Sequence, residues 1–118
     1  MSLGFQIVTF RIPAPPCGES FEDSESFKFD NPIAWERRGR PNVDVALRTF
    51  DLRFLSNGSD HEYAVGREFV KLDVSTNRGH RDGVVNLEVQ LRPMSPPGRP
   101  DLGYKGLVEA LVIAEVLD

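Results

Sequence analysis

The residue types best suited to holding a ligand stand together in one proline-bounded stretch, residues 31–42. Trp35 is followed there by Arg37, Arg38 and Arg40. An indole ring beside guanidinium groups can stack on another ring and can hold a phosphate, a carboxylate or sugar hydroxyls. We therefore predict a ligand-binding loop, for which the alternative is a solvated charged loop that Trp35 anchors to the core.

Catalytic and metal chemistry have weaker support. Asp60 precedes His61, but neighbouring side chains of a strand point apart, and a zinc site normally takes about four ligands. His80 stands in a different loop, and the single Cys17 has no metal-ligand or nucleophile spacing around it. No arrangement of Ser, His and Asp resembles a nucleophilic triad. We predict no enzyme activity, no cofactor and no metal site, with structural or solvent roles for these residues.

Length and charge limit the class of protein. A chain of 118 residues with 40% hydrophobic content has the size of one domain, so we expect residues 1–118 to share a single core. The formal charge of -4 gives no global field that would attract nucleic acid. No apolar run reaches the ~20 residues of a membrane span, and the N-terminus lacks the pattern of a secretory signal, so a cytoplasmic location is expected.

Apolar residues recur at every second position in several segments, which predicts β-strands. The clearest alternation runs from Val84 to Leu91 and implies one buried and one wet face. Residues 104–116 favour a central strand covered on both faces, with a helix as the alternative. Together with residues 3–12, 27–29, 43–55 and 63–74, these segments predict an all-β fold, an antiparallel β-sandwich of about six strands.

Two hairpins follow from the turn residues. Asn57-Gly58 predicts a type I′ turn, because both central residues of that turn need positive φ. The register that follows pairs Asp44 with Lys71, Val45 with Val70, Val43 with Leu72, Arg53 with Glu62, and Arg48 with Arg67. A second hairpin centred on Gly79-His80 pairs Val70, Leu72 and Val74 with Val89, Leu87 and Val85.

The pairing of Arg48 with Arg67 adds a second candidate binding site. Like charges that face each other across strands repel unless something bridges them. Asp51 or Glu68 supplies that bridge in one interpretation, and a bound anion supplies it in the other. Arg48 and Arg67 therefore join the predicted ligand-binding residues.

The apolar side of the first hairpin changes between its base and its tip. Odd positions are apolar from Val43 to Leu47, whereas even positions are apolar from Phe50 to Phe54, and the partner strand switches near Gly66. Either each strand carries a β-bulge there, or the hairpin buries opposite faces at its base and its tip. In the second case the tip exposes an apolar subunit interface formed by Phe50, Leu52, Phe54 and Tyr63. Symmetric homo-oligomers are the commonest outcome for such a patch.

The segments FKFDNP at residues 27–32, VDVAL at residues 43–47 and LVIA at residues 111–114 resemble the H-type lectin family. Members of that family are small six-stranded sandwiches that form trimers and bind sugars at subunit edges. The resemblance spans residues 25–116 and implies a β-sandwich, a homo-oligomer and a carbohydrate ligand. It assigns no sugar-contacting residue in this chain.

These observations together predict a noncatalytic module that binds carbohydrate or a small anionic ligand and acts as a homo-oligomer. The alternative is a structural subunit of a larger assembly with no small-molecule ligand. We expect neither a nucleic-acid partner nor a membrane span.

Overall fold

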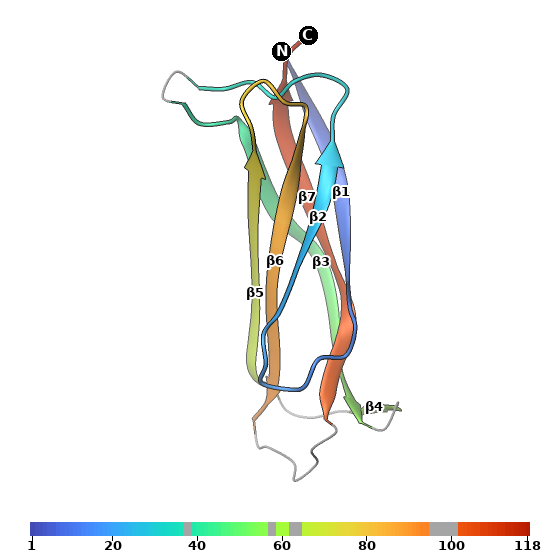
Figure 1. Ribbon diagram of the computed structural model, residues 1–118. Helices are drawn as coiled ribbons and strands as arrows, with labels where there is room; N and C mark the ends of the chain where they lie inside the picture. The colour runs from blue at the N-terminus through green and yellow to red at the C-terminus, as the bar shows by residue number, and fades with distance from the viewer. Residues whose placement is uncertain (37–38, 57–58, 62–64, 95–101) are drawn as a thin grey trace.

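Two antiparallel β-sheets pack face to face, which confirms the predicted all-β sandwich (Figure 1). The computed structural model describes residues 1–36, 39–56, 59–61, 65–94 and 102–118, without the side chains of residues 56 and 59–61. Within this part of the chain there are seven strands and no helix. The strands are β1 (Ser2–Ile12), β2 (Phe21–Lys28), β3 (Val43–Ser56), β4 (Ser59–His61), β5 (Val65–Thr76), β6 (Asp82–Pro93) and β7 (Gly103–Val116).

The strand order defines sheet A, with the order β1-β7-β3-β4, and sheet B, with the order β2-β6-β5. β7 is a central strand, as predicted for residues 104–116, and the helix alternative is wrong. Its even-numbered residues are buried except at Gly106, because they face sheet B. Its odd-numbered Leu107, Leu111 and Ile113 remain partly exposed. The described part of the chain therefore covers β7 on one face only, whereas both faces were expected to be covered.

The sandwich is long and thin. Its extents are 56 × 24 × 17 Å. Its radius of gyration of 17.4 Å exceeds the about 13.5 Å expected for a compact domain of this length. Long strands cause this shape, since β3 and β7 have 14 residues each. Both termini lie at one end of the molecule with the loops at residues 29–42 and 77–81, and we call this the termini end (Figure 1).

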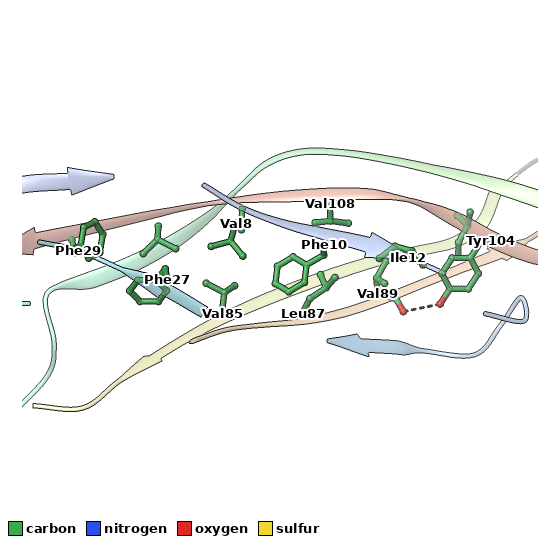
Figure 2. Close-up of a cluster of buried hydrophobic side chains, with 14 of the residues drawn as sticks. Val8, Phe10, Ile12, Phe27, Phe29, Val85, Leu87, Val89, Tyr104 and Val108 are labelled. Atoms are coloured by element: carbon green, nitrogen blue, oxygen red, sulfur yellow. Dashed lines mark hydrogen bonds between the residues drawn. The ribbon is translucent and has the colours of Figure 1, made fainter. Parts of the chain in front are cut away.

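The core lies between the two sheets and is built from alternate residues of β1, β6 and β7 (Figure 2). Phe10 of β1, Leu87 of β6 and Val108 of β7 are almost completely buried. Burial of such a side chain stabilises the fold by about 1.5–3 kcal/mol. Phe27 and Phe29 close the core near the termini end with their rings in edge contact, 5.7 Å between centroids.

Tyr104 connects sheet A to sheet B by a hydrogen bond inside the core (Figure 2). Its hydroxyl lies 3.1 Å from the carbonyl oxygen of Val89 and 2.6 Å from that of Glu19, so its proton has two acceptors. Burial raises the pKa of this phenol, and the nearby Cys17 and Glu19 raise it further. The hydroxyl is therefore a donor at neutral pH.

The predicted register of the second hairpin is confirmed. The pairs are Val70 with Val89, Leu72 with Leu87, and Val74 with Val85. The connection is longer than the two-residue turn expected, because the last pair is Thr76 with Gly83. Within it the N–H of His80 donates to the carbonyl of Asn77 at 3.0 Å, and Gly79 has a positive φ of 81°.

The first predicted hairpin forms only next to its turn. Phe54 pairs with His61 and Ser56 with Ser59, as expected, but Asn57-Gly58 lies outside the described residues. The longer pairing of β3 with β5 is wrong, because β5 belongs to sheet B. β3 pairs instead with β7, whose long apolar run offers it a partner over most of its length. In place of the predicted partners, Val43 faces Ala114, Asp44 faces Ile113, Val45 faces Val112, and Arg53 faces Lys105.

Two β-bulges account for the change of apolar side. The register of β3 with β7 shifts around Arg48, and that of β5 with β6 shifts around Gly66. A Cβ on Gly66 would lie 2.7 Å from the Cα of Met94, so glycine is required there. A bulge on each strand was one of the two alternatives, and it keeps the apolar side chains at base and tip directed toward the core.

Candidate functional site

Trp35 and Arg40 belong to a tight loop at the termini end. Two hydrogen bonds close its backbone, from the N–H of Glu36 to the Arg40 carbonyl at 2.7 Å and from that of Gly39 to the Glu36 carbonyl at 3.0 Å. Trp35 is half-buried and Arg40 is exposed. The other two predicted ligand-binding residues of this loop, Arg37 and Arg38, lie outside the described residues.

A residue that the sequence did not connect with Trp35 lies over its ring. The guanidinium carbon of Arg78, from the β5–β6 connection, is 5.8 Å from the centroid of the Trp35 ring. The backbone holds the two loops together, since the N–H of Ile33 donates to the His80 carbonyl at 3.0 Å. Arg78 is exposed, whereas the Trp35 Nε1 is enclosed and has no hydrogen-bond partner among the described residues. Arg78 and Trp35 therefore form a cation–π pair at this end of the molecule.

Arg48 and Arg67 do not face each other, so the predicted like-charge pair is wrong. Arg48 lies at the bulge of β3 in sheet A, and its Nη1 is 2.9 Å from the Oε2 of Glu109. Arg67 lies in sheet B opposite Arg92, with its guanidinium carbon 5.6 Å from the centroid of the Phe69 ring. The two arginines therefore cannot share one anion.

The predicted interface residues do not form one exposed patch. Because the bulge turns the tip of β3 inward, Phe54 lies in the core at 4% exposure and Leu52 packs against it. Phe50 is 41% exposed. Tyr63 lies outside the described residues. Of this set, the structure leaves Phe50 accessible to a partner.

An exposed apolar surface that the sequence analysis missed lies on the outer face of sheet A, near the termini end. Leu3, Phe5 and Ile7 of β1 are 61%, 57% and 51% exposed. Phe5 pairs with Ile113 and Ile7 with Leu111 on β7, and Leu111 pairs with Ala46 on β3. We call these six outward-facing residues the apolar half of sheet A: Leu3, Phe5, Ile7, Ala46, Leu111 and Ile113. The sequence contains a signal of this surface, because residues 3–7 are apolar at odd positions whereas residues 8–12 are apolar at even positions.

The other half of the same face is charged. The ion pair of Arg48 with Glu109 lies at the boundary. Beyond it come Arg11 of β1, Leu107 and Lys105 of β7, and Asp51 and Arg53 of β3, which we call the basic half of sheet A. A depression of about 340 Å³ opens among these side chains.

The outer face of sheet B is polar throughout most of its length. It carries a shallow groove of about 550 Å³. The Ser24 Oγ donates to the Asn86 Oδ1 at 2.6 Å within this groove. Glu22 faces Glu88 directly across two strands, and the carboxylates outnumber the one cation, Lys71. The groove is therefore unfavourable for an anion.

Comparison with family models, with curated proteins and with solved structures gives no match to this chain. Among the described residues, no three His, Cys, Asp or Glu side chains are grouped so that they could hold a metal ion. The same part of the chain contains no helix that could cross a membrane. A functional assignment therefore depends on the surfaces described above.

Proposed function

We propose that the chain is a noncatalytic ligand-binding module that acts as a homo-oligomer through the apolar half of sheet A. The observation that carries this proposal is the run of Leu3, Phe5 and Ile7, each more than half exposed on one edge strand. Contiguous exposed apolar patches on a protein surface mark interaction sites. Ile113 and Leu111 of the neighbouring strand widen the run into a patch.

The occupant that we propose for this surface is a second copy of the chain. The elongated sandwich has an accessible surface of 7385 Å², roughly 1,000 Å² more than the about 6,400 Å² typical of a monomer of this mass. A standard interface removes about 800 Å² from each partner, an area that a surface of this size can supply. The patch lies on the open face of a sheet, with Asp44 opposite Ile113 and Glu115 opposite Leu3 at its border, and the same patch on a second copy is its proposed partner.

The ligand-binding part of the proposal rests on Trp35 and Arg78. A half-buried indole with an exposed guanidinium 5.8 Å from its centroid can hold a sugar ring or a small anionic group. The resemblance of residues 27–32, 43–47 and 111–114 to H-type lectins favours carbohydrate. Both groups belong to the loops at residues 29–42 and 77–81, which lie at the termini end (Figure 1), and not to the strands that pack the core.

Fluorescence tests the ligand site directly, because Trp35 is the single tryptophan of the chain. Titration with neutral and acidic monosaccharides should give a saturable change in emission, and Arg78→Gln should weaken the apparent affinity at least fivefold. Arg92→Gln, which removes the same charge from sheet B, should leave the titration unchanged. A flat response to the whole panel would contradict the ligand-binding proposal.

A structural subunit is the second candidate, favoured by the 56 Å length of the narrow sandwich. Light scattering, combined with the fluorescence titration, distinguishes the structural subunit from the ligand-binding module. Large assemblies together with a flat fluorescence response would support the structural role, whereas a small closed oligomer with saturable binding supports the module.

A further inference from the structure

The edge of sheet A formed by β1 is open, and we propose that it pairs in antiparallel fashion with β1 of a second copy of the chain. This inference rests on the proposed homo-oligomer and specifies how two copies of the apolar half of sheet A meet. β1 is the outermost strand of sheet A, with β7 on one side and no strand of the described residues on the other. The backbone groups at such an edge are a template for pairing with another strand.

The backbone groups of alternate β1 residues lie at this open edge. In the central strand β7, the N–H of Glu115 donates to the Asn42 carbonyl at 2.9 Å, on the side of β3. Because successive residues of a strand bond to opposite sides, the even-numbered residues of β7 bond to β1, where they pair with even-numbered residues, such as Ala114 with Gly4. The N–H and C=O groups that point away from β7 are therefore those of the odd-numbered residues Leu3, Phe5, Ile7, Thr9 and Arg11. Within the described part of the chain, no backbone hydrogen bond reaches them.

The other long strands with an open edge carry features that hinder pairing with another chain. β2 has four charged residues in eight, and its Ser24 N–H is bound by the Asp23 Oδ1 at 2.8 Å. β5 has four charged residues in twelve and the bulge at Gly66. β3 has a bulge as well, and the Asp44 Oδ1 accepts a hydrogen bond from the Val45 N–H at 3.0 Å.

β1 has none of these features. Its pairing with β7 runs over all eleven residues without a shift of register, and the strand contains no proline, no lysine and one charged residue, Arg11. The residues whose backbone groups lie at the edge are also those whose side chains face outward. Leu3, Phe5 and Ile7 are the exposed apolar residues among them. The open backbone edge and the apolar row therefore coincide on the same residues.

A second copy of β1 is the partner that the charges and side chains of the strand favour. The outward-facing row has Arg11 near one end, and Glu115 of β7 lies beside Leu3 at the other end. Antiparallel pairing of two copies brings these opposite charges toward each other, whereas parallel pairing would place Arg11 beside Arg11. Antiparallel pairing also sets the two apolar rows side by side, at the spacing of about 5 Å at which cross-strand apolar pairs stabilise a sheet.

Amide hydrogen exchange of the ¹⁵N-labelled full chain tests the edge directly. The amides of Gln6 and Val8 bond to β7 and serve as the internal reference. In the assembled protein, the amides of Phe5 and Ile7 should exchange within tenfold of the reference rate, because the second copy protects them. Dilution to the dissociated chain should speed the exchange of Phe5 and Ile7 at least tenfold more than that of Gln6 and Val8.

Two variants of Ile7 separate edge pairing from contact through the face of the sheet. Ile7→Pro removes one edge N–H but keeps an apolar side chain, and an edge strand tolerates proline where its N–H faces outward. Ile7→Ala is the matched control, because it keeps the N–H and loses more apolar surface. Light scattering over a dilution series should give a dissociation constant at least tenfold higher for Ile7→Pro than for the wild type, with a smaller rise for Ile7→Ala. Circular dichroism checks that each variant is folded, and the exchange of the wild type decides if Ile7→Pro is not.

The outcomes distinguish this inference from the proposed function. An assembled wild type whose Phe5 and Ile7 amides exchange as fast as those of an unstructured peptide would overturn edge pairing and leave the apolar half of sheet A as the interface. Equal weakening by Ile7→Ala and a folded Ile7→Pro would do the same. A monomeric wild type would overturn both.

Discussion

The outer faces of the two sheets belong to the same sandwich and are very different. On sheet B, the exposed positions of β2 and β6 are mostly serine, asparagine and charged residues, as expected for a surface in water. On sheet A, half of the corresponding face carries Leu3, Phe5, Ile7, Leu111 and Ile113. The same fold thus has one polar outer face and one outer face that is apolar over half of its length.

The difference shows how to interpret a strand that is apolar on both sides. β6 alternates cleanly, and its polar side is found in solvent. β1 and β7 do not alternate cleanly, yet the described residues provide only one layer to cover them. We propose that an apolar pattern on two faces of a strand within a two-layer fold marks a surface that another chain covers.

The largest expected effect separates the inner from the outer side of β1. Phe10→Ala should lower the free energy of unfolding by about 3–5 kcal/mol, because it leaves a cavity between the sheets. Phe5→Ala on the same strand should lower it by less than about 1 kcal/mol in dilute, dissociated protein, since Phe5 is 57% exposed. Urea unfolding followed by circular dichroism measures both. Equal losses would contradict the assignment of inner and outer faces.

A smaller effect is expected at the hydrogen bond that joins the sheets. Tyr104→Phe keeps the ring and removes the donor to the Val89 and Glu19 carbonyls. The free energy of unfolding should fall by about 1 kcal/mol, mainly because buried carbonyl acceptors are left without a donor. Thermal unfolding at several pH values checks this, and a variant as stable as the wild type would show that the bond contributes nothing net.

Sheet B should tolerate, and even gain from, a change of charge. Glu22 faces Glu88, which faces Lys71 on its other side. Glu22→Lys replaces a repulsive cross-strand pair by an attractive one and should raise the free energy of unfolding by about 0.2–1 kcal/mol at low salt. The gain should shrink at high ionic strength. A Glu22→Lys variant that is less stable than the wild type would contradict the interpretation of the outer face of sheet B as a solvated surface.

The smallest effect concerns the basic half of sheet A. The hydrogen bond from Arg53 holds the pKa of the Asp51 carboxyl below its usual range. Because the folded-state pKa is lowered, the associated stability is present above the ordinary pKa and is lost as pH falls through the folded value. Arg53→Gln should therefore raise the pKa of Asp51, as followed by the pH dependence of its carboxyl ¹³C signal. An unchanged pKa would contradict this cause.

Local patterns predicted the strands well. The alternation from Val84 to Leu91 gave a correct buried face, and the spacing around Gly79 gave the correct register of β5 with β6. The change of apolar side left two alternatives, and the structure has the first of them, a bulge on each strand, at Arg48 and at Gly66. These features depend on residues close in sequence, where the two-residue period of a strand determines which side chain faces the core.

Partners between distant strands could not be predicted in the same way. Asn57-Gly58 suggested that β3 continues along β5, but the more apolar β7 pairs with it, and β7 begins more than 40 residues later. For the same reason Arg78 could not be connected with Trp35, nor Lys105 with Arg53. The candidate sites are made by contacts between strands and loops whose pairing depends on the whole core.

Multi-angle light scattering of Phe5→Asp beside the wild type tests the central claim, the apolar half of sheet A as an interface. Ser26→Asp, which places the same charge on the exposed face of sheet B, is the matched control. The wild type and Ser26→Asp should both have a mass that is a multiple of 13.2 kDa, and Phe5→Asp should be a folded monomer of 13.2 kDa. A monomeric wild type, or a Phe5→Asp variant that keeps the wild-type mass, would contradict the account.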